Sequence, residues 1–146
     1  MPAADDLAVI VAEWVARAEG DLKTALQTLK LKSQCPTETV AFHAQQCVEK
    51  YTKAMLIWSR IDFPKTHNIR HLVEMLPESS RPSISVHDQN SLTPYAVEAR
   101  YPGDFEPVSL TEARQVVALA RQVRGEIRKM LPPSALRPRS KLTGLE

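Results

Sequence analysis

Hydrophobic residues recur at helical spacing along most of this chain, and the two clearest repeats lie near its ends. Between residues 5 and 31 the apolar positions alternate spacings of three and four residues, which is typical of a bundle helix. They are Leu7, Val11, Trp14, Ala18, Leu22, Ala25 and Leu29. Between residues 109 and 131 they are Ala113, Val116, Val117, Ala120, Val123, Ile127 and Met130 or Leu131. Ser109 and Glu112 have capping-box spacing, so the last long helix is predicted to begin there.

The stretch from Thr39 to Arg60 is predicted to be the helix around which the others pack. At about 100° per residue, one side of it is continuously apolar. That side holds Val40, Ala44, Cys47, Val48, Tyr51, Ala54, Met55 and Trp58. Phe42, Leu56 and Ile57 lie outside this side, so one partner helix cannot cover all the apolar surface. Such a helix belongs in the middle of a bundle or at a subunit interface.

Shorter helices are expected between these long ones. Thr66 can cap a helix whose apolar face is Ile69, Leu72, Val73 and Leu76. A further short helix is expected to begin at Ser91 or Thr93 and to stop at Pro102-Gly103, after an exposed polar loop over residues 78–91. No strand pattern competes. We predict an all-α fold, an antiparallel up-and-down bundle of four main helices plus a short extra helix over residues 1–132, and a disordered tail over residues 133–146.

Composition and charge narrow the function classes. The chain has 146 residues and a net charge of +2, which by itself implies no nucleic-acid partner. The C-terminal part, from residue 114 to residue 141, is strongly basic and can attract phosphates or an acidic protein surface. No run of about eighteen apolar residues exists, and the N-terminus lacks the basic start of a signal peptide. We therefore expect a cytoplasmic protein without a membrane span, with Cys35 and Cys47 as reduced thiols.

A polar stripe borders the apolar side of the central helix and is the first candidate site. It consists of His43, Gln46, Lys50 and Lys53. Lysines and an amide could hold an anionic ligand, or the stripe could be the partly wet margin of a buried helix, with lysine stems covering apolar surface. His67 follows the rigid turn Pro64-Lys65-Thr66, where it could bind phosphate, act as an acid–base group or fix the turn. No Gly-rich phosphate loop, zinc motif or nucleophile elbow is present, so no cofactor and no metal are expected.

Arginine–histidine pairs are the weak catalytic candidates. Arg81 and His87 lie six positions apart in the polar loop, and Arg100 with Tyr101 precedes the Pro-Gly stop. In metal-independent RNA cleavage a histidine moves the proton while an arginine neutralises the charge on the phosphoryl group. Such a spacing also arises by chance, and a Pro/Ser-rich loop would not hold the pair in place.

Four blocks, in this order, resemble a HEPN domain (higher eukaryotes and prokaryotes nucleotide-binding). They are Trp14-x-x-x-Ala18-x-x-Asp21-Leu22, Phe42-His43-Ala44-Gln45-Gln46-Cys47-Val48-Glu49-Lys50, Phe63-Pro64-Lys65-Thr66-His67 and Leu92-Thr93-x-Tyr95-x-x-x-Ala99-Arg100-Tyr101-Pro102. The resemblance covers about residues 5 to 131. It implies a helical bundle that commonly forms a homodimer and is found with a minimal nucleotidyltransferase, in proposed toxin–antitoxin or nucleotide-handling pairs.

In ribonuclease members of that family, an Arg and a His four to six residues apart face a cleft in the dimer. Arg100 is the best positional match to that arginine, but residues 105 to 107 are Phe, Glu and Pro, so the histidine is missing. Arg81 and His87 fit the spacing but come too early. The resemblance therefore favours a HEPN subunit that dimerises, works with a nucleotidyltransferase and binds a nucleotide or RNA phosphate near His43, Gln46, Lys50, Lys53, His67, Arg100 and Tyr101. The alternatives are a metal-independent ribonuclease toxin and a pure interaction module without ligand.

Overall fold

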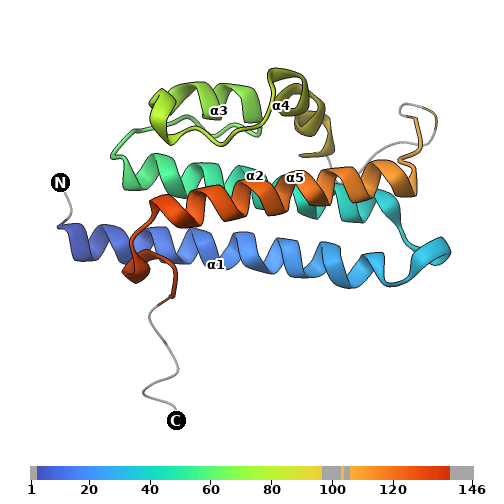
Figure 1. Cartoon of the computed structure of the whole chain (residues 1–146), viewed down its shortest axis with the longest axis horizontal. Helices are drawn as coiled ribbons and strands as arrows, with labels where there is room; N and C mark the ends of the chain where they lie inside the picture. The colour runs from blue at the N-terminus through green and yellow to red at the C-terminus, as the bar shows by residue number, and fades with distance from the viewer. Residues whose placement is uncertain (1–2, 97–102, 104–105, 139–146) are drawn as a thin grey trace, which may run out of the picture.

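A computed structural model describes residues 3–96, 103 and 106–138 of the chain. The long helices are α1 (Ala4–Leu29), α2 (Thr37–Trp58) and α5 (Leu110–Met130), and the short ones are α3 (Ile69–Met75) and α4 (Val86–Leu92). In Figure 1, α2 runs antiparallel to α1, with α5 packed in front of it and α3 and α4 on its far side from α1. No strand occurs among the described residues, so the predicted all-α bundle is confirmed.

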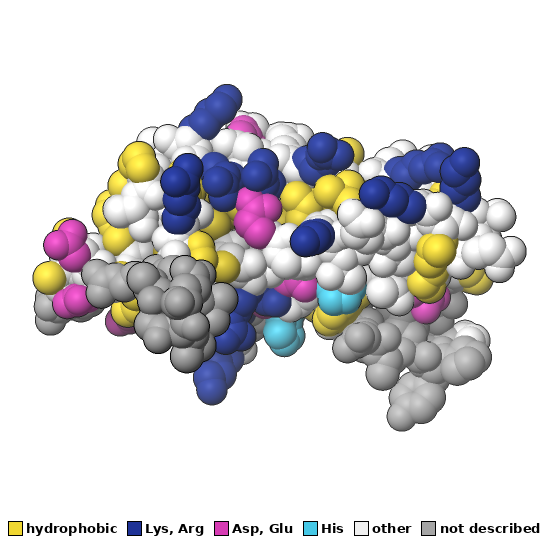
Figure 2. All heavy atoms as spheres, turned by 90° about the horizontal axis from the view of Figure 1, so that it is seen from below, with side chains coloured by type: hydrophobic (Ala, Val, Ile, Leu, Met, Phe, Trp, Pro, Cys, Tyr) yellow, Lys and Arg dark blue, Asp and Glu magenta, His cyan; other side chains and the backbone are white. Residues whose placement is uncertain are grey.

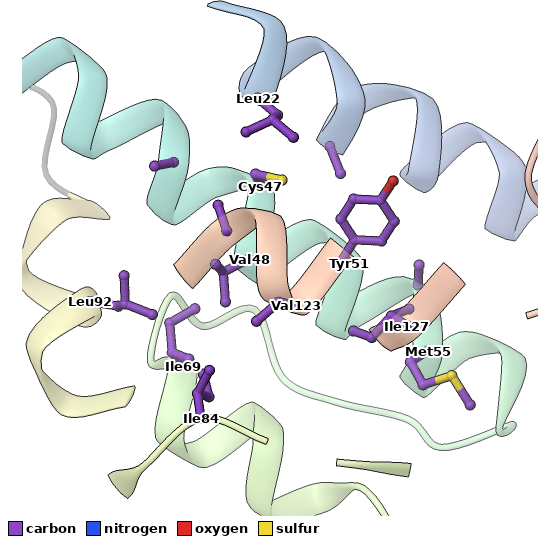
Figure 3. Packing of buried hydrophobic residues seen from close by; sticks show 14 of the residues in the cluster. Leu22, Cys47, Val48, Tyr51, Met55, Ile69, Ile84, Leu92, Val123 and Ile127 are labelled. Carbon is purple, nitrogen blue, oxygen red and sulfur yellow. The ribbon is translucent and has the colours of Figure 1, made fainter. Parts of the chain in front are cut away.

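The central place of α2 follows from its apolar surface, as predicted. It packs against α1, α5, α3 and the short 3-10 turn η3 (Thr93–Ala96), while α1 and α5 contact α2 far more than each other. Tyr51 and Leu56 are fully buried on it. Figure 3 shows Leu22 of α1 above Cys47, Val123 and Ile127 of α5 beside the helix, and Ile69, Ile84 and Leu92 below it. One continuous core therefore surrounds α2.

The C-terminal end of α2 turns the chain sharply toward α3. Arg60 adopts the left-handed conformation, with φ of 59°. Its N–H donates to the Ile57 carbonyl, and the Ile61 N–H donates to the Leu56 carbonyl, each at 2.9 Å. These are the two bonds of a Schellman motif, here with arginine where glycine is usual. The turn directs residues 61–68 back along the polar stripe of α2.

The structure corrects three expectations about the shorter elements. The segment 78–91, expected to be an exposed loop, contains η2 (Glu78–Ser80) and most of α4, whose Gln89 and Leu92 are buried. Ser85 caps α4 by accepting from the Asp88 N–H at 3.1 Å. The expected helix from Ser91 or Thr93 is the end of α4 followed by η3, and residues 97–102 lie outside the described part. Asn68 caps α3, not Thr66, whose hydroxyl instead accepts from the Asn68 N–H.

The predicted cap of the last helix is confirmed, and the packed region extends beyond residue 132. The Ser109 hydroxyl accepts from the Glu112 N–H at 3.0 Å. After α5 the turn η4 (Pro133–Ala135) packs on α1, with Ala135 fully buried. A buried alanine anchors residues that were expected to be disordered; residues 139–146 lie outside the described part. Within the described chain, none of the helices has both the length and the apolar content needed to cross a membrane.

Two leucines of contrasting exposure test the central role of α2. Leu56→Ala removes a fully buried side chain, and we expect it to lower the free energy of unfolding by about 2–5 kcal/mol. Leu31→Ala makes the same chemical change at a side chain that is 54% exposed, so its cost should be within about 0.5 kcal/mol. Urea unfolding followed by circular dichroism measures both. Equal losses in the two variants would contradict this account of the core.

Candidate functional site

Two acidic residues hold the polar stripe of α2 in two hydrogen-bonded clusters. The first is Asp21 of α1, which is nearly buried. Its carboxylate bonds the His43 ring at 2.8 Å, through Nδ1, and the Lys50 ammonium at 2.6 Å. Asp21 thus joins α1 to α2 along one border of their apolar contact.

The second acidic residue is Glu49 of α2, whose side chain is 4% exposed. It accepts from the Lys53 ammonium at 3.0 Å and pairs with Nδ1 of His67 at 2.9 Å. The His67 ring is 66% exposed, so the buried carboxylate holds one ring nitrogen while most of the ring faces solvent. This carboxylate–histidine arrangement orients an imidazole for acid–base chemistry.

Two amides extend the cluster around Glu49. Gln46 donates to the Gln45 side-chain oxygen at 2.7 Å and to Glu49 Oε1 at 3.4 Å. Gln45, fully buried, donates to Glu49 at 3.2 Å and to the His67 carbonyl at 3.4 Å. The structure therefore places the predicted residues His43, Gln46, Lys50, Lys53 and His67 along one continuous polar border. Asp21, Gln45 and Glu49 were not predicted as site residues.

A hollow of about 420 Å³ opens beside this border, between α1 and α2. Its lining residues are Glu13, Trp14 and Arg17 of α1 and Glu49, Lys50 and Lys53 of α2. The Lys53 ammonium lies 5.9 Å from the centre of the Trp14 ring and 5.8 Å from that of Phe63, within cation–π range. Figure 2 shows histidine side chains beside acidic and basic ones in the lower half of the view.

Charge compensation decides which cation of this hollow is available to a ligand. Lys50 and Lys53 each have a carboxylate within 3.0 Å, so their charges are largely balanced. Arg17 is exposed and makes no ion pair with any residue that the structure describes. An incoming anion would therefore find its strongest uncompensated attraction at Arg17.

The other sequence candidates lie apart from these two clusters or outside the described residues. Arg81 donates to the Leu76 carbonyl at 2.9 Å and to the Glu74 carbonyl at 3.0 Å, so its guanidinium closes the C-terminal end of α3. His87 is exposed in the first turn of α4. Arg100 and Tyr101 fall outside the described part of the chain.

On the other border of the α1–α2 contact, Glu19 of α1 is the common acceptor of three side chains. Tyr51 donates to it at 2.6 Å, Arg124 at 2.8 and 3.0 Å, and Arg128 at 2.9 Å. Burial, followed by the hydrogen bond to Glu19, raises the pKa of the Tyr51 phenol. Burial lowers the pKa of Arg124, but the hydrogen bond to Glu19 and its charge outweigh that effect, so the net pKa is raised.

Among the described residues, no group of three or more His, Cys, Asp or Glu side chains is placed to hold a metal ion. The ionic chemistry available here is hydrogen bonding, charge pairing and proton transfer by His43 and His67. Either imidazole could exchange a proton with a ligand only through the nitrogen that its carboxylate leaves free.

The fold is an all-α bundle, and along one border of its central helix α2 the lysines pair with carboxylates. A sequence profile of the HEPN domain family matches residues 11–130. The chain therefore belongs to the HEPN domain family, which suggests a function related to nucleotides or RNA. Comparison with curated proteins and with solved structures gives no match.

The buried thiol of Cys47 gives a test of how α1 and α2 pack. Burial, reinforced by the charges of Glu19 and Asp21, raises the pKa of Cys47 well above the ordinary thiol value, so the reactive thiolate is suppressed in the folded protein. We expect a disulfide reagent at pH 8 to modify only the half-buried Cys35 in native protein and both thiols in denaturant. The variant Cys35→Ser should be unreactive until unfolded. Rapid labelling of native Cys35→Ser would contradict this packing.

Proposed function

We propose that this protein is a cytoplasmic HEPN subunit that forms a homodimer, works with a minimal nucleotidyltransferase and binds a phosphate-bearing ligand in the hollow between α1 and α2. The ligand is a nucleotide or an RNA phosphate. The observation that carries the ligand part is that Arg17, which has no ion pair with any described residue, lines that hollow together with two lysines and an indole ring, beside Glu13 and Glu49. Guanidinium groups bind phosphate through paired hydrogen bonds, and an indole offers a surface for a base.

The lysines of the hollow have a supporting role in this proposal. Asp21 and Glu49 hold the Lys50 and Lys53 ammonium groups at fixed positions before a ligand arrives. A phosphate would share these ammonium donors with the carboxylates, while Arg17 would supply the net attraction. Preorganised donors reduce the entropy lost on binding.

A second hollow, of about 590 Å³, supports the homodimer. It is mainly apolar and is lined by Leu7 and Ile10 of α1 and by Ile57, Ile61 and Phe63 at the end of α2 and beyond, together with Arg60 and Asp62. Ile10 is 42% exposed. We assign this surface to contact with a second copy of the chain, because exposed contiguous apolar surface marks interaction sites.

Titration with ATP and GTP tests the ligand site. We expect isothermal titration calorimetry to show binding with a Kd below about 1 mM, weakening as salt concentration rises. Arg17→Ala should weaken binding by about tenfold, because it removes the cation of this hollow that no described carboxylate balances.

Lys23→Ala is the matched control for that change. It removes an exposed cation that also lacks an ion pair with any described residue but lies outside this hollow, so the affinity should be unchanged. If wild type gives no heat at millimolar nucleotide, or if both variants lose affinity equally, the ligand site is misplaced. A chain that binds no nucleotide but co-purifies with a small nucleotidyltransferase would be an interaction module only.

The Glu49–His67 pair favours one second candidate function, metal-independent RNA cleavage. His67 would take the proton of the 2′-hydroxyl at its free ring nitrogen while the 2′-oxygen bonds to phosphorus. The bond from phosphorus to the 5′-oxygen then breaks, and that oxygen takes a proton from water, leaving a 2′,3′-cyclic phosphate. Arg17 would balance the charge that develops on the phosphoryl oxygens.

Cleavage of a labelled single-stranded RNA in the presence of EDTA tests this candidate. We expect His67→Ala to lower the rate by about a hundredfold, the usual contribution of a positioned acid–base group. His87→Ala, an equivalent change at an exposed histidine on α4, should leave the rate unchanged. If His87→Ala abolishes cleavage while His67→Ala retains it, the active site is the Arg81–His87 pair suggested by sequence spacing; loss of cleavage in Arg100→Ala would instead place the site at Arg100.

A further inference from the structure

A hollow of about 360 Å³ lies on the opposite flank of α1, between α1 and α5. Its side chains include Leu22, Lys23, Leu26 and Gln27 of α1 and Arg121 and Arg124 of α5. In Figure 2, apolar surface lies between Lys and Arg side chains in the upper half of the view, with an acidic side chain beside them. At about 100° per residue, this face of α1 is turned half a circle away from the face that carries Trp14 and Arg17.

The positive charge of this hollow is not balanced within the described chain. Glu19, the acid that also lines it, already accepts from Arg124 and Arg128. Lys23 and Arg121 are exposed, and neither makes an ion pair with any residue that the structure describes. The hollow therefore presents two free cations, one on each wall, in addition to the Arg124 guanidinium.

Two leucines supply the apolar lining of the hollow. Leu22 is buried and Leu26 half-buried, and they lie one helical turn apart. Lys23 and Gln27 form a parallel row on the same wall at the same spacing, and Arg121 and Arg124 form the facing row on α5. An apolar strip with cationic walls complements a helix that has an apolar stripe and acids on both sides of it.

The lining residues distinguish this occupant from a nucleic acid. Sites for single-stranded nucleic acid combine a basic groove with aromatic side chains on which bases stack. None of the residues that line this hollow is aromatic, and leucine side chains have no charge or hydrogen-bond donor with which to bind phosphates. We propose that the groove between α1 and α5 docks an acidic amphipathic helix of a partner protein.

To test this proposal, helical peptides randomised on one face are displayed as a library and selected for binding to the protein. We expect selection to enrich leucine-type residues at helical spacing, flanked by Asp or Glu. For a selected peptide, the double variant Lys23→Glu/Arg121→Glu should raise the Kd measured by fluorescence anisotropy at least about tenfold. A peptide with Lys in place of its acids should then bind the double variant better than wild type.

The control Lys65→Glu/Lys129→Glu changes the net charge equally at exposed positions outside the hollow, and its Kd should stay within about twofold of wild type. Enrichment of neutral or basic helices, or of none, would overturn the proposal. The proposal would also be overturned if the protein bound a 20-nucleotide single-stranded RNA and the double variant Lys23→Glu/Arg121→Glu lost that binding. Because Arg17→Ala leaves this groove intact, failure here can be told apart from failure of the nucleotide site.

Discussion

The carboxylate of Glu19 is the point at which the three long helices are tied together. It accepts from Tyr51 of α2 and from Arg124 and Arg128 of α5, all within 3.0 Å. Since α1 and α5 pack mainly on α2 and little on each other, these ion pairs are a direct link between α1 and α5. Removing Glu19 would leave two arginines facing each other without an acid.

On the other flank of α1, a second acid, Asp21, joins α1 to α2 by pairing with His43 and Lys50. Positions two apart in sequence differ by about 200° around a helix axis, so Glu19 and Asp21 border opposite sides of the α1–α2 contact. Cys47 lies between them, and both charges raise the pKa of its thiol. The two flanks differ in their charge balance. Asp21 and Glu49 neutralise the lysines of one, whereas the single acid of the other is already occupied by Arg124 and Arg128.

Apolar periodicity predicted the long helices and the central place of α2, because that pattern directly records which faces are buried. It did not reveal α4, a seven-residue helix with only Gln89 and Leu92 buried. Ser85 followed three residues later by Asp88 was a usable capping signal there. At α3, Thr66 and Asn68 were both possible caps, and only backbone geometry shows that Asn68 accepts from the His71 N–H.

The polar stripe of α2 could be located from the sequence, but its charge balance could not. Position on a helix shows which side chains share a border, whereas Asp21 is 29 residues from Lys50 and pairs with it only through helix packing. Lysine and arginine positions alone therefore overstate the attraction for anions at His43, Lys50 and Lys53. Within the part of the chain that the structure describes, the two flanks of α1 differ in which cations have no carboxylate partner: Arg17 on one side, Lys23 and Arg121 of α5 on the other. This difference is the basis on which we propose an anion site at one flank and a protein-binding groove at the other.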